Sequence, residues 1–186
     1  MKVLVKYGLD NTAKLELLAD SSVLPTGRPL FLPYWAEQFD ATLAVAVRVS
    51  RLGKCVATRF AHRYWDAFTA CLLTQATDTT PAGHDTLALR RAHDGALLAG
   101  QMMPRELLEA PQPTLQWHMG KTPVGQMALE QVPAIVDTTL SQVSQYMTLK
   151  MGDLLCLCSP VTHRLDIGQT CVVTLDDQAL LKTNIK

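Results

Sequence analysis

The sequence predicts an α+β protein built on a mixed β-sheet that is rolled or stacked as a sandwich, with a few short helices. Most periodic segments read as strands, the clearest being ATLAVAVRVSRL over 41–52, which is rich in β-branched and small residues. A helical spacing of apolar residues is clear only over 133–147. Helices interrupt the strands irregularly, which favours α+β over repeated βαβ units.

In the first half of the chain, alternating apolar residues, turn residues and capping residues define each element. Residues 11–19 have helical spacing with Asn11 or Thr12 as N-cap, and Gly53-Lys54 ends the long strand. Thr58 is an N-cap for a helix over 58–68. The other predicted elements here are strands at 2–6, 30–32 and 69–77 and a short helix at 86–92.

In the second half, four prolines between 95 and 125 leave room only for short strands near 115–117 and 126–129. Pro133 lies in the first turn of the clearest helix, which keeps one face apolar as far as Met147. Strands then follow at 153–158, 169–175 and 179–185, and the last two form a hairpin through Asp176-Asp177-Gln178.

The length of 186 residues predicts one domain, 1–186, in which 1–30 form a short strand–helix–loop segment. A chain of this size buries about 70% of its unfolded surface. The hydrophobic content of 48% is therefore enough for a sizeable core.

The formal charge is zero, from 17 basic and 17 acidic residues. This balance predicts no nucleic-acid partner, and the absence of Lys/Arg runs predicts no membrane surface. No apolar run reaches the ~18 residues of a membrane helix, and no signal-peptide pattern is visible at the N-terminus. The cytoplasm is the expected compartment.

Five cysteines are expected as free thiols. Cys156 and Cys158 alternate with leucines, so both thiols point to one face of their strand. A zinc site needs about four ligands, and no second pair accompanies them. We therefore expect small buried residues here.

Four stretches carry a family resemblance. RPLFLPYWAEQFDATLAVAVRVSRLGK is similar to a pattern E-x-E-x-V-V-x-I-x-R-x-G-K, and FAHRYWDAFTACLLTQATD to a segment that ends in D-x-S/T-A-R-D. RRAHDGALLAG is similar to K-x-F-D-G-S, and the segment that begins at Ser144 to T-L-x-x-G-D followed by T-G-T-P. In their order and spacing, these stretches resemble the fumarylacetoacetate hydrolase family.

The resemblance implies a rolled mixed sheet of the C-terminal-domain type and a homodimer. It also implies Mg²⁺ or Mn²⁺ held by carboxylates, with cleavage or decarboxylation of a C–C bond in 2-oxo acids, as in acylpyruvate hydrolysis. Such a cation needs oxygen ligands and open positions for the substrate.

The family's ligand positions are neutral in this sequence. Counting back from Arg51-Leu52-Gly53-Lys54 places the two glutamates of E-x-E at Thr42 and Ala44. Counting back from Asp78 places the third carboxylate at Leu73. A threonine hydroxyl is a poor ligand, and the other two side chains offer none.

The acid–base pair of the family falls on Asp10 and Ala13 and its lysine on Arg91, so no catalytic set is intact. The resemblance leaves Asp78, Arg91, Asp94, Gly95, Ser159 and Pro160 as substrate-pocket candidates. His93 replaces the aromatic residue beside Asp94, and Cys158 replaces a glycine before Ser159. A guanidinium suits a small carboxylate ligand, which it binds through a bidentate fork.

Two functions follow from these residues. The first is a pseudoenzyme that has lost metal binding and catalysis and acts as a small-molecule binder or an interaction protein, so no cofactor is expected. The alternative is an active metal-dependent hydrolase or decarboxylase of 2-oxo acids with a relocated site. That site would use Mg²⁺ or Mn²⁺ and draw on Asp40, Asp78 or Asp10.

Overall fold

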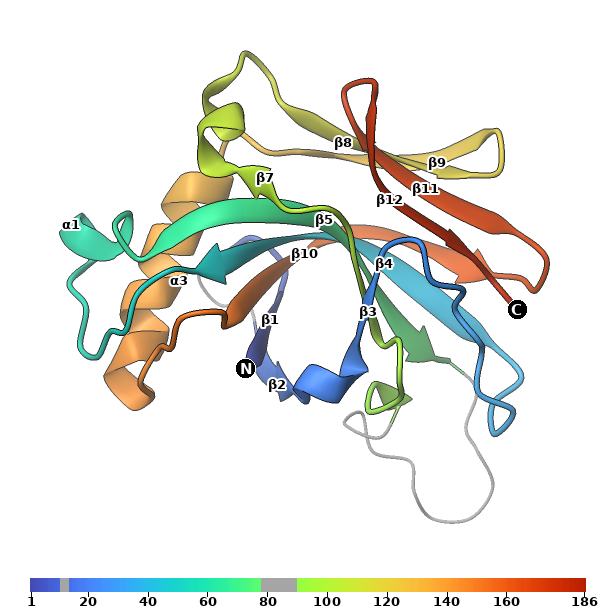
Figure 1. The fold of residues 1–186 in the computed structure, drawn as a ribbon, viewed down its shortest axis with the longest axis horizontal. Helices are drawn as coiled ribbons and strands as arrows, with labels where there is room; N and C mark the ends of the chain where they lie inside the picture. The colour runs from blue at the N-terminus through green and yellow to red at the C-terminus, as the bar shows by residue number, and fades with distance from the viewer. Residues whose placement is uncertain (11–13, 78–89) are drawn as a thin grey trace.

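Two β-sheets dominate the computed structural model, which describes residues 1–10, 14–77 and 90–186 (Figure 1). The eight-stranded sheet has the order β2-β1-β10-β4-β5-β6-β3, with β7 paired to β5, and the four-stranded sheet has the order β12-β11-β8-β9. The strands are β1 (Val3–Tyr7), β2 (Leu15–Leu18), β3 (Val23–Pro25), β4 (Phe39–Val49), β5 (Trp65–Ala76), β6 (Leu97–Ala99), β7 (Met103–Pro104), β8 (Thr114–Met119), β9 (Thr122–Ala128), β10 (Leu154–Leu165), β11 (Thr170–Leu175) and β12 (Gln178–Asn184).

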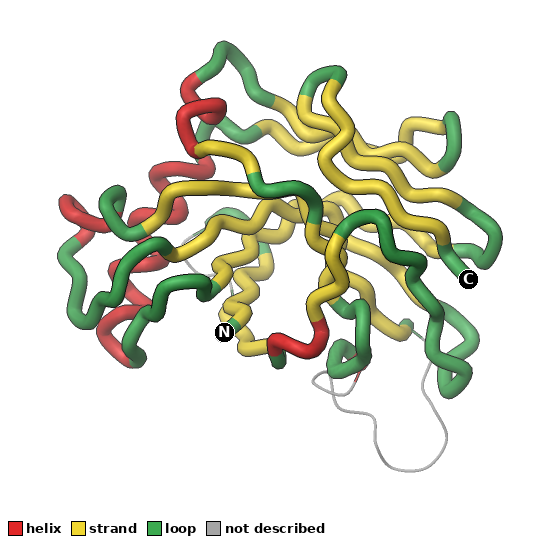
Figure 2. Tube along the Cα trace, in the orientation of Figure 1, coloured by secondary structure: helices red, strands yellow, loops and turns green. Residues whose placement is uncertain are grey.

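The helices of residues 58–61, 105–109 and 132–146 lie at one end of the sheets, and the short helix of residues 20–22 lies between β2 and β3 (Figure 2). They are α1 (Thr58–Ala61), α3 (Val132–Tyr146) and the 3-10 helices η1 (Asp20–Ser22) and η2 (Arg105–Glu109). Helix α3 has proline in its first turn and buries Val136 and Leu140, as its spacing predicts. None of the helices in the described parts of the chain is long and apolar enough to cross a membrane.

The larger sheet is mixed, because β1 runs parallel to β10 and β3 parallel to β6 while its other pairs are antiparallel. It curls so that its two edge strands, β2 and β3, lie across from the central strands β4 and β5 (Figure 1). The predicted α+β class and rolled mixed sheet are therefore confirmed.

Each long strand divides its side chains between two faces. Along β4, Leu43, Val45 and Val47 enter one hydrophobic cluster, and Ala44 and Ala46 enter the other. This is the alternation that a strand imposes on successive residues. We call the face inside the roll, which includes Ala44, the inner face, and the opposite one the outer face.

The outer face forms the larger core. The four-stranded sheet contributes residues such as Trp117 and Val173, and α3 contributes Val136, Leu140 and Val143. Contacts of β9, β11 and β12 with β4, β5 and β10 place this sheet on the outer face. Large side chains fill the space between these layers.

The helix predicted over 11–19 is wrong for residues 15–18. They form β2, which pairs antiparallel with β1 from Leu15 opposite Lys6 to Leu18 opposite Val3. Because β1 offers unpaired backbone groups on that side, pairing overrides a weak helical spacing. Residues 11–13 lie outside the described part of the chain.

The helix predicted over 58–68 is also too long. Helix α1 ends at Ala61, and β5 begins at Trp65, whose register partner on β4 is Val49. Trp65 is 2% exposed, so its burial in the outer core favours the strand over a longer helix.

Other boundaries also differ from the prediction. The strand expected to end at Cys158 continues to Leu165 through an irregularity between Cys158 and Thr162. Of residues 30–32, Leu30 alone makes a β-bridge, to Ile185. The helix predicted over 86–92 lies mostly outside the described residues.

Candidate functional site on the inner face

The three positions equated with metal ligands lie together on the inner face. Thr42 and Leu73 are direct register partners across β4 and β5, although they were located from separate sequence anchors. Ala44 lies two residues beyond Thr42 on the same strand, between Cys71 of β5 and Cys158 of β10. The geometric arrangement implied by the resemblance is therefore present, with neutral side chains.

These side chains are packed and satisfied. Ala44 and Leu73 are buried in the inner cluster, at 0% and 2% exposure. The Thr42 hydroxyl lies 3.0 Å from the Thr162 hydroxyl and shares a hydrogen bond with it. None of the three therefore presents a charged oxygen to the inner face.

A hard divalent cation does not fit this set of donors, because Mg²⁺ and Mn²⁺ favour carboxylate, carbonyl and water oxygens. Two of the three positions carry hydrocarbon side chains. Within residues 1–10, 14–77 and 90–186, no three His, Cys, Asp or Glu side chains are arranged to hold a metal ion. Asp40 is the carboxylate two residues before Thr42 on β4, and its register partners are Gln75 and Arg164.

Thiols take up much of the inner face. Cys71, Cys156 and Cys158 are all buried there, and all five cysteines of the chain are free thiols. A hydrogen bond with Cys156 and burial both raise the pKa of Cys158 above its ordinary value. Cys158 therefore stays protonated at neutral pH. All three thiols are buried and pack as small apolar groups, as expected for Cys156 and Cys158.

A polar network covers one side of this apolar cluster. Arg91 donates to Glu16 Oε2 at 2.8 Å and to Gln75 Oε1 through Nε at 2.8 Å and through its second terminal nitrogen at 2.5 Å. Tyr7 donates its hydroxyl to the same Glu16 oxygen at 2.9 Å. The guanidinium carbon lies 4.2 Å from the centre of the Tyr7 ring, which adds a cation–π contact.

The hydrogen bonds of this network join its members to one another and restrict their side chains. The Arg91 side chain is 10% exposed and that of Glu16 is 27% exposed. Burial, opposed in part by Arg91 and reinforced by the bond to Glu16, raises the pKa of Tyr7 above its ordinary value. Tyr7 therefore remains a phenol that donates to Glu16, and Glu16 and Gln75 accept from three of the five N–H donors of Arg91.

The sequence analysis missed Glu16 and Gln75. The prediction placed Glu16 in a helix, and a helix there gives no indication that the Glu16 side chain faces the site. A strand interpretation of LELL would have placed it on the same face as Leu18, which belongs to the inner cluster. Gln75 shares the face of Leu73 by the same two-residue spacing on β5.

Residues near Arg91 do not all face the inner cluster. His93 packs edge-to-face on Trp35 and Phe39, with its Nε2 atom 2.9 Å from the Thr74 hydroxyl. Phe39 belongs to the outer core, so His93 lies on that side. Burial lowers the pKa of His93 below its ordinary value, although Asp94 opposes the shift.

Two other substrate-pocket candidates in this loop differ in exposure. Asp94 is exposed, whereas Gly95 is buried. Gly95 has a φ of +85°, and a side chain there would meet Leu30 at 2.6 Å. This glycine is therefore required by the backbone and by close packing.

Ser159 and Pro160 lie at a different place from Arg91. The Ser159 hydroxyl donates to the Leu43 carbonyl at 2.8 Å and accepts from the Val161 amide at 3.1 Å, which holds the irregular part of β10. Both residues border a cavity of about 300 Å³ that Arg91, Asp94 and Gly95 do not line. The cavity is lined by Leu9, Gln126, Met127, Ala128, Glu130, Gln131, Ser159, Pro160 and Val161.

Of the two positions equated with the acid–base pair, the structure describes Asp10. Asp10 is exposed, and its backbone carbonyl accepts a hydrogen bond from the Lys6 ammonium at 2.5 Å. Ala13 and Asp78 lie outside the described residues. Of the named candidates, the structure thus brings together Thr42, Ala44 and Leu73, with the Arg91 network beside the same cluster.

The chain belongs to the fumarylacetoacetate hydrolase family. The model of the family's C-terminal region, described as fumarylacetoacetate (FAA) hydrolase C-terminal, matches residues 11–186. A search among curated proteins finds no significant match. Membership therefore rests on the family model and agrees with the fold.

Solved structures with the same fold include enzymes of two kinds. A fumarylpyruvate hydrolase from Pseudomonas aeruginosa, in complex with Mn²⁺ and pyruvate, superposes with a TM-score of 0.84 at 14% identity, over 100% of this chain and 89% of its own. A 5-carboxymethyl-2-hydroxymuconate delta-isomerase from Mycobacterium smegmatis gives a TM-score of 0.83 at 16% identity, over 99% and 78%. A 2-hydroxyhepta-2,4-diene-1,7-dioate isomerase from Mycobacterium marinum gives 0.83 at 18% identity, over 99% and 73%. At these identities the likeness concerns the fold.

Proposed function

We propose that this chain is a pseudoenzyme of the fumarylacetoacetate hydrolase family, without a divalent-metal site or C–C bond cleavage. One observation carries the proposal: Thr42, Ala44 and Leu73 meet on the inner face and offer no carboxylate. Replacing even an outer-shell partner of a metal ligand costs about 10–100-fold in affinity or activity. Replacing three ligand charges should therefore abolish useful binding.

The proposed role is to bind a small molecule or another protein, with no metal cofactor. A small carboxylate is the proposed ligand class, because Arg91 is the cation beside the inner cluster. It would have to compete with Glu16 for the guanidinium. We also propose a homodimer in the cytoplasm, which light scattering and fractionation would test.

An active hydrolase or decarboxylase of 2-oxo acids is the second candidate. The fumarylpyruvate hydrolase with the same fold carries Mn²⁺ and pyruvate, which favours it. Asp40 also has the two-residue spacing from Thr42 that places both side chains on one face of β4. In this case Asp40 would bind Mg²⁺ or Mn²⁺ together with Asp78 or Asp10.

Thermal unfolding with metal and with chelator separates the two candidates. A ligand that binds only the folded state raises the unfolding midpoint. We expect the midpoint to be the same with Mn²⁺, Mg²⁺ or EDTA, and no loss of ultraviolet absorbance when an acylpyruvate is added. A midpoint raised by Mn²⁺ in the wild type and unchanged by it in Asp40→Asn would favour the relocated site instead.

A further inference from the structure

A cluster of positive charge lies at the end of the molecule that carries the helices. We call it the cationic end and define it by Arg51, Lys54, Arg59, Arg63 and Lys150. All five residues are exposed. They come from the loop after β4, from α1 and the turn after it, and from the turn before β10.

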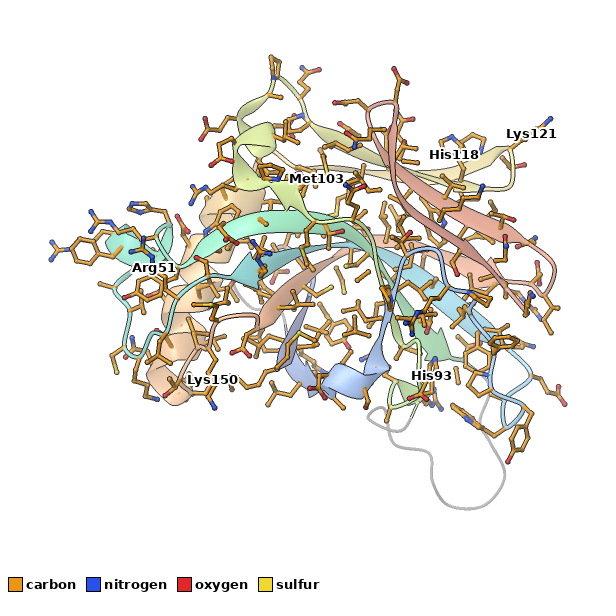
Figure 3. All side chains as sticks on the ribbon, viewed as in Figure 1. Arg51, His93, Met103, His118, Lys121 and Lys150 are labelled. Carbon is orange, nitrogen blue, oxygen red and sulfur yellow. The ribbon has the colours of Figure 1, made fainter. Side chains whose placement is uncertain are left out.

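Backbone contacts bring these distant segments together. Gly53 forms a β-bridge with Leu149, and the Cys55 amide donates to the Ser144 carbonyl at 2.9 Å. The Lys54 ammonium donates to the Gln145 carbonyl at 3.1 Å. Figure 3 shows Arg51 and Lys150 at the same end of the molecule, with Lys121 at the opposite end.

The described residues do not neutralise the charges of the cationic end. None of its five residues forms an ion pair with an acid in the described parts of the chain. The two acids nearest in sequence are each held by another cation: Asp66 by Arg48 through two hydrogen bonds of 3.0 and 2.9 Å, and Asp153 by Lys2 at 2.5 Å. In a chain of zero net charge, this local excess creates a positive field at one end.

Phe60 organises two of these cations. The guanidinium carbons of Arg59 and Arg63 lie 4.7 and 5.2 Å from the centre of its ring. Such contacts favour a defined position for an exposed guanidinium beside the ring. Two guanidinium groups are therefore held beside one ring, with their hydrogen-bond donors available to carboxylates.

Large apolar side chains project from the same end. Leu52 is 71% exposed, Tyr146 is 85% exposed and Met151 is 76% exposed. Leu52 is adjacent to Arg51, and Met151 and Tyr146 lie one and four residues from Lys150. Arginine, tyrosine and methionine are enriched in protein interfaces, and exposed apolar residues gathered among charges mark interaction sites.

We propose that the cationic end is a docking surface for an acidic segment of a partner protein that also carries apolar side chains. Charge complementarity supplies the choice of partner, since arginine forks pair with carboxylates. The same surface on a second copy would bring cations against cations. The proposal stands independently of whether the inner face is catalytic.

Selection from a displayed library of random peptides on the immobilised full chain tests the proposal directly. We expect the enriched peptides to combine several Asp or Glu residues with aromatic or aliphatic ones. Their affinity should fall as salt is raised above about 0.15 M, because exposed charges are then screened. Enrichment without acidic residues would overturn the proposal.

Paired variants locate the binding. Arg59→Glu with Arg63→Glu should weaken the selected peptides at least about tenfold, and Leu52→Ser with Met151→Ser should weaken them as well. Lys121→Glu with Lys182→Glu is the matched control on the four-stranded sheet and should leave binding unchanged. All these side chains lie at exposed positions, so each variant should keep the wild-type unfolding midpoint. Equal binding by Arg59→Glu with Arg63→Glu and by wild type would contradict the proposal.

Two other occupants are separate outcomes of the same test. Sedimentation with vesicles of phosphatidylserine and phosphatidylcholine should show no binding by the wild type, and binding lost in Arg59→Glu with Arg63→Glu would assign the surface to a membrane. Light scattering should give the same mass for that variant and the wild type. A mass halved by the substitutions would assign the surface to contact between copies.

Discussion

The two faces of the eight-stranded sheet use the same strands for different kinds of packing. The outer face presents large side chains such as Leu43 and Phe68 to the second sheet and to α3. The inner face of the central strands presents small ones, among them Ala44, Cys71 and Cys156. Side chains on the inside of a curled sheet converge, so small residues fit there.

This difference shows how a family fold can persist when its site changes. The outer face supplies most of the core. Its large apolar side chains pack against the second sheet and α3, as in other layered folds. The inner face keeps the arrangement of the ligand positions but fills it with neutral groups beneath the Arg91 network. Fold and site chemistry therefore depend on separate sets of residues.

The largest effect should come from the outer face. Phe68→Ala removes a fully buried ring and should lower the free energy of unfolding by about 3–5 kcal/mol. Urea unfolding followed by circular dichroism measures this loss. Cys71→Ala on the inner face of the same strand removes one sulfur atom and is the matched control. A loss for Phe68→Ala no greater than for this control would contradict the assignment of the faces.

Ala44→Leu tests how tightly the inner face is packed. Ala44 is fully buried between Cys71 and Cys158, and overpacking a filled core costs about 1–3 kcal/mol. We expect a loss of that size in urea unfolding. If the substitution left the stability unchanged or higher, the inner face would hold open space for a ligand, and the comparison of the two faces would fail.

Glu16→Ala tests the network that covers the inner face. It leaves Arg91 and Tyr7 without their shared acceptor, at a cost of about 1–3 kcal/mol for partly buried donors. Glu130→Ala removes an exposed carboxylate and should change the stability by less than about 0.5 kcal/mol. In a double-mutant cycle with Arg91→Met, strictly additive losses would show that Glu16 and Arg91 do not interact.

The smallest expected effect comes from His93, which lies on the outer side of the sheet. It is a dependence of the free energy of unfolding on pH. Thr74 donates its hydroxyl to the Gly95 carbonyl, so His93 Nε2 must donate to Thr74. Burial between Trp35 and Phe39 lowers the pKa of His93, although Asp94 opposes the shift. His93 then binds a proton more readily in the unfolded chain than in the folded one. The contribution of His93 to the free energy of unfolding is therefore fully present above about pH 6.5 and decreases as the pH falls below that value.

The measurement is urea unfolding at about pH 7.5 and about pH 5.5, on either side of the ordinary histidine pKa. Wild type should lose more stability on acidification than His93→Phe, which keeps an aromatic ring but cannot titrate. An equal loss in both proteins would mean that His93 is not the titrating group.

Local patterns in the sequence were sufficient for the elements that set the fold class. The alternation of Leu43, Ala44 and Val45 in β4 and the spacing of Val136 and Leu140 in α3 both matched the structure. The family pattern also placed Thr42 and Leu73, which proved to be neighbours. These signals are carried by residues close together in the chain.

Interactions between distant segments were not accessible in this way. Residues 15–18 form a strand because β1 lies beside them, and β5 begins at Trp65 because the outer core buries that ring. The Glu16–Arg91 pair joins residues 75 positions apart. No local spacing encodes such a pair, so the polar network that covers the inner face could not be predicted from the sequence.

Diffraction from a crystal soaked with Mn²⁺ and oxalate tests the central claim most directly. Oxalate supplies the paired oxygens of a 2-oxo acid, and manganese scatters anomalously. We predict no anomalous peak between Thr42 and Leu73, which face each other across β4 and β5 without a carboxylate. A peak there, coordinated by Asp40 or another acid of the chain, would contradict the loss of the metal site.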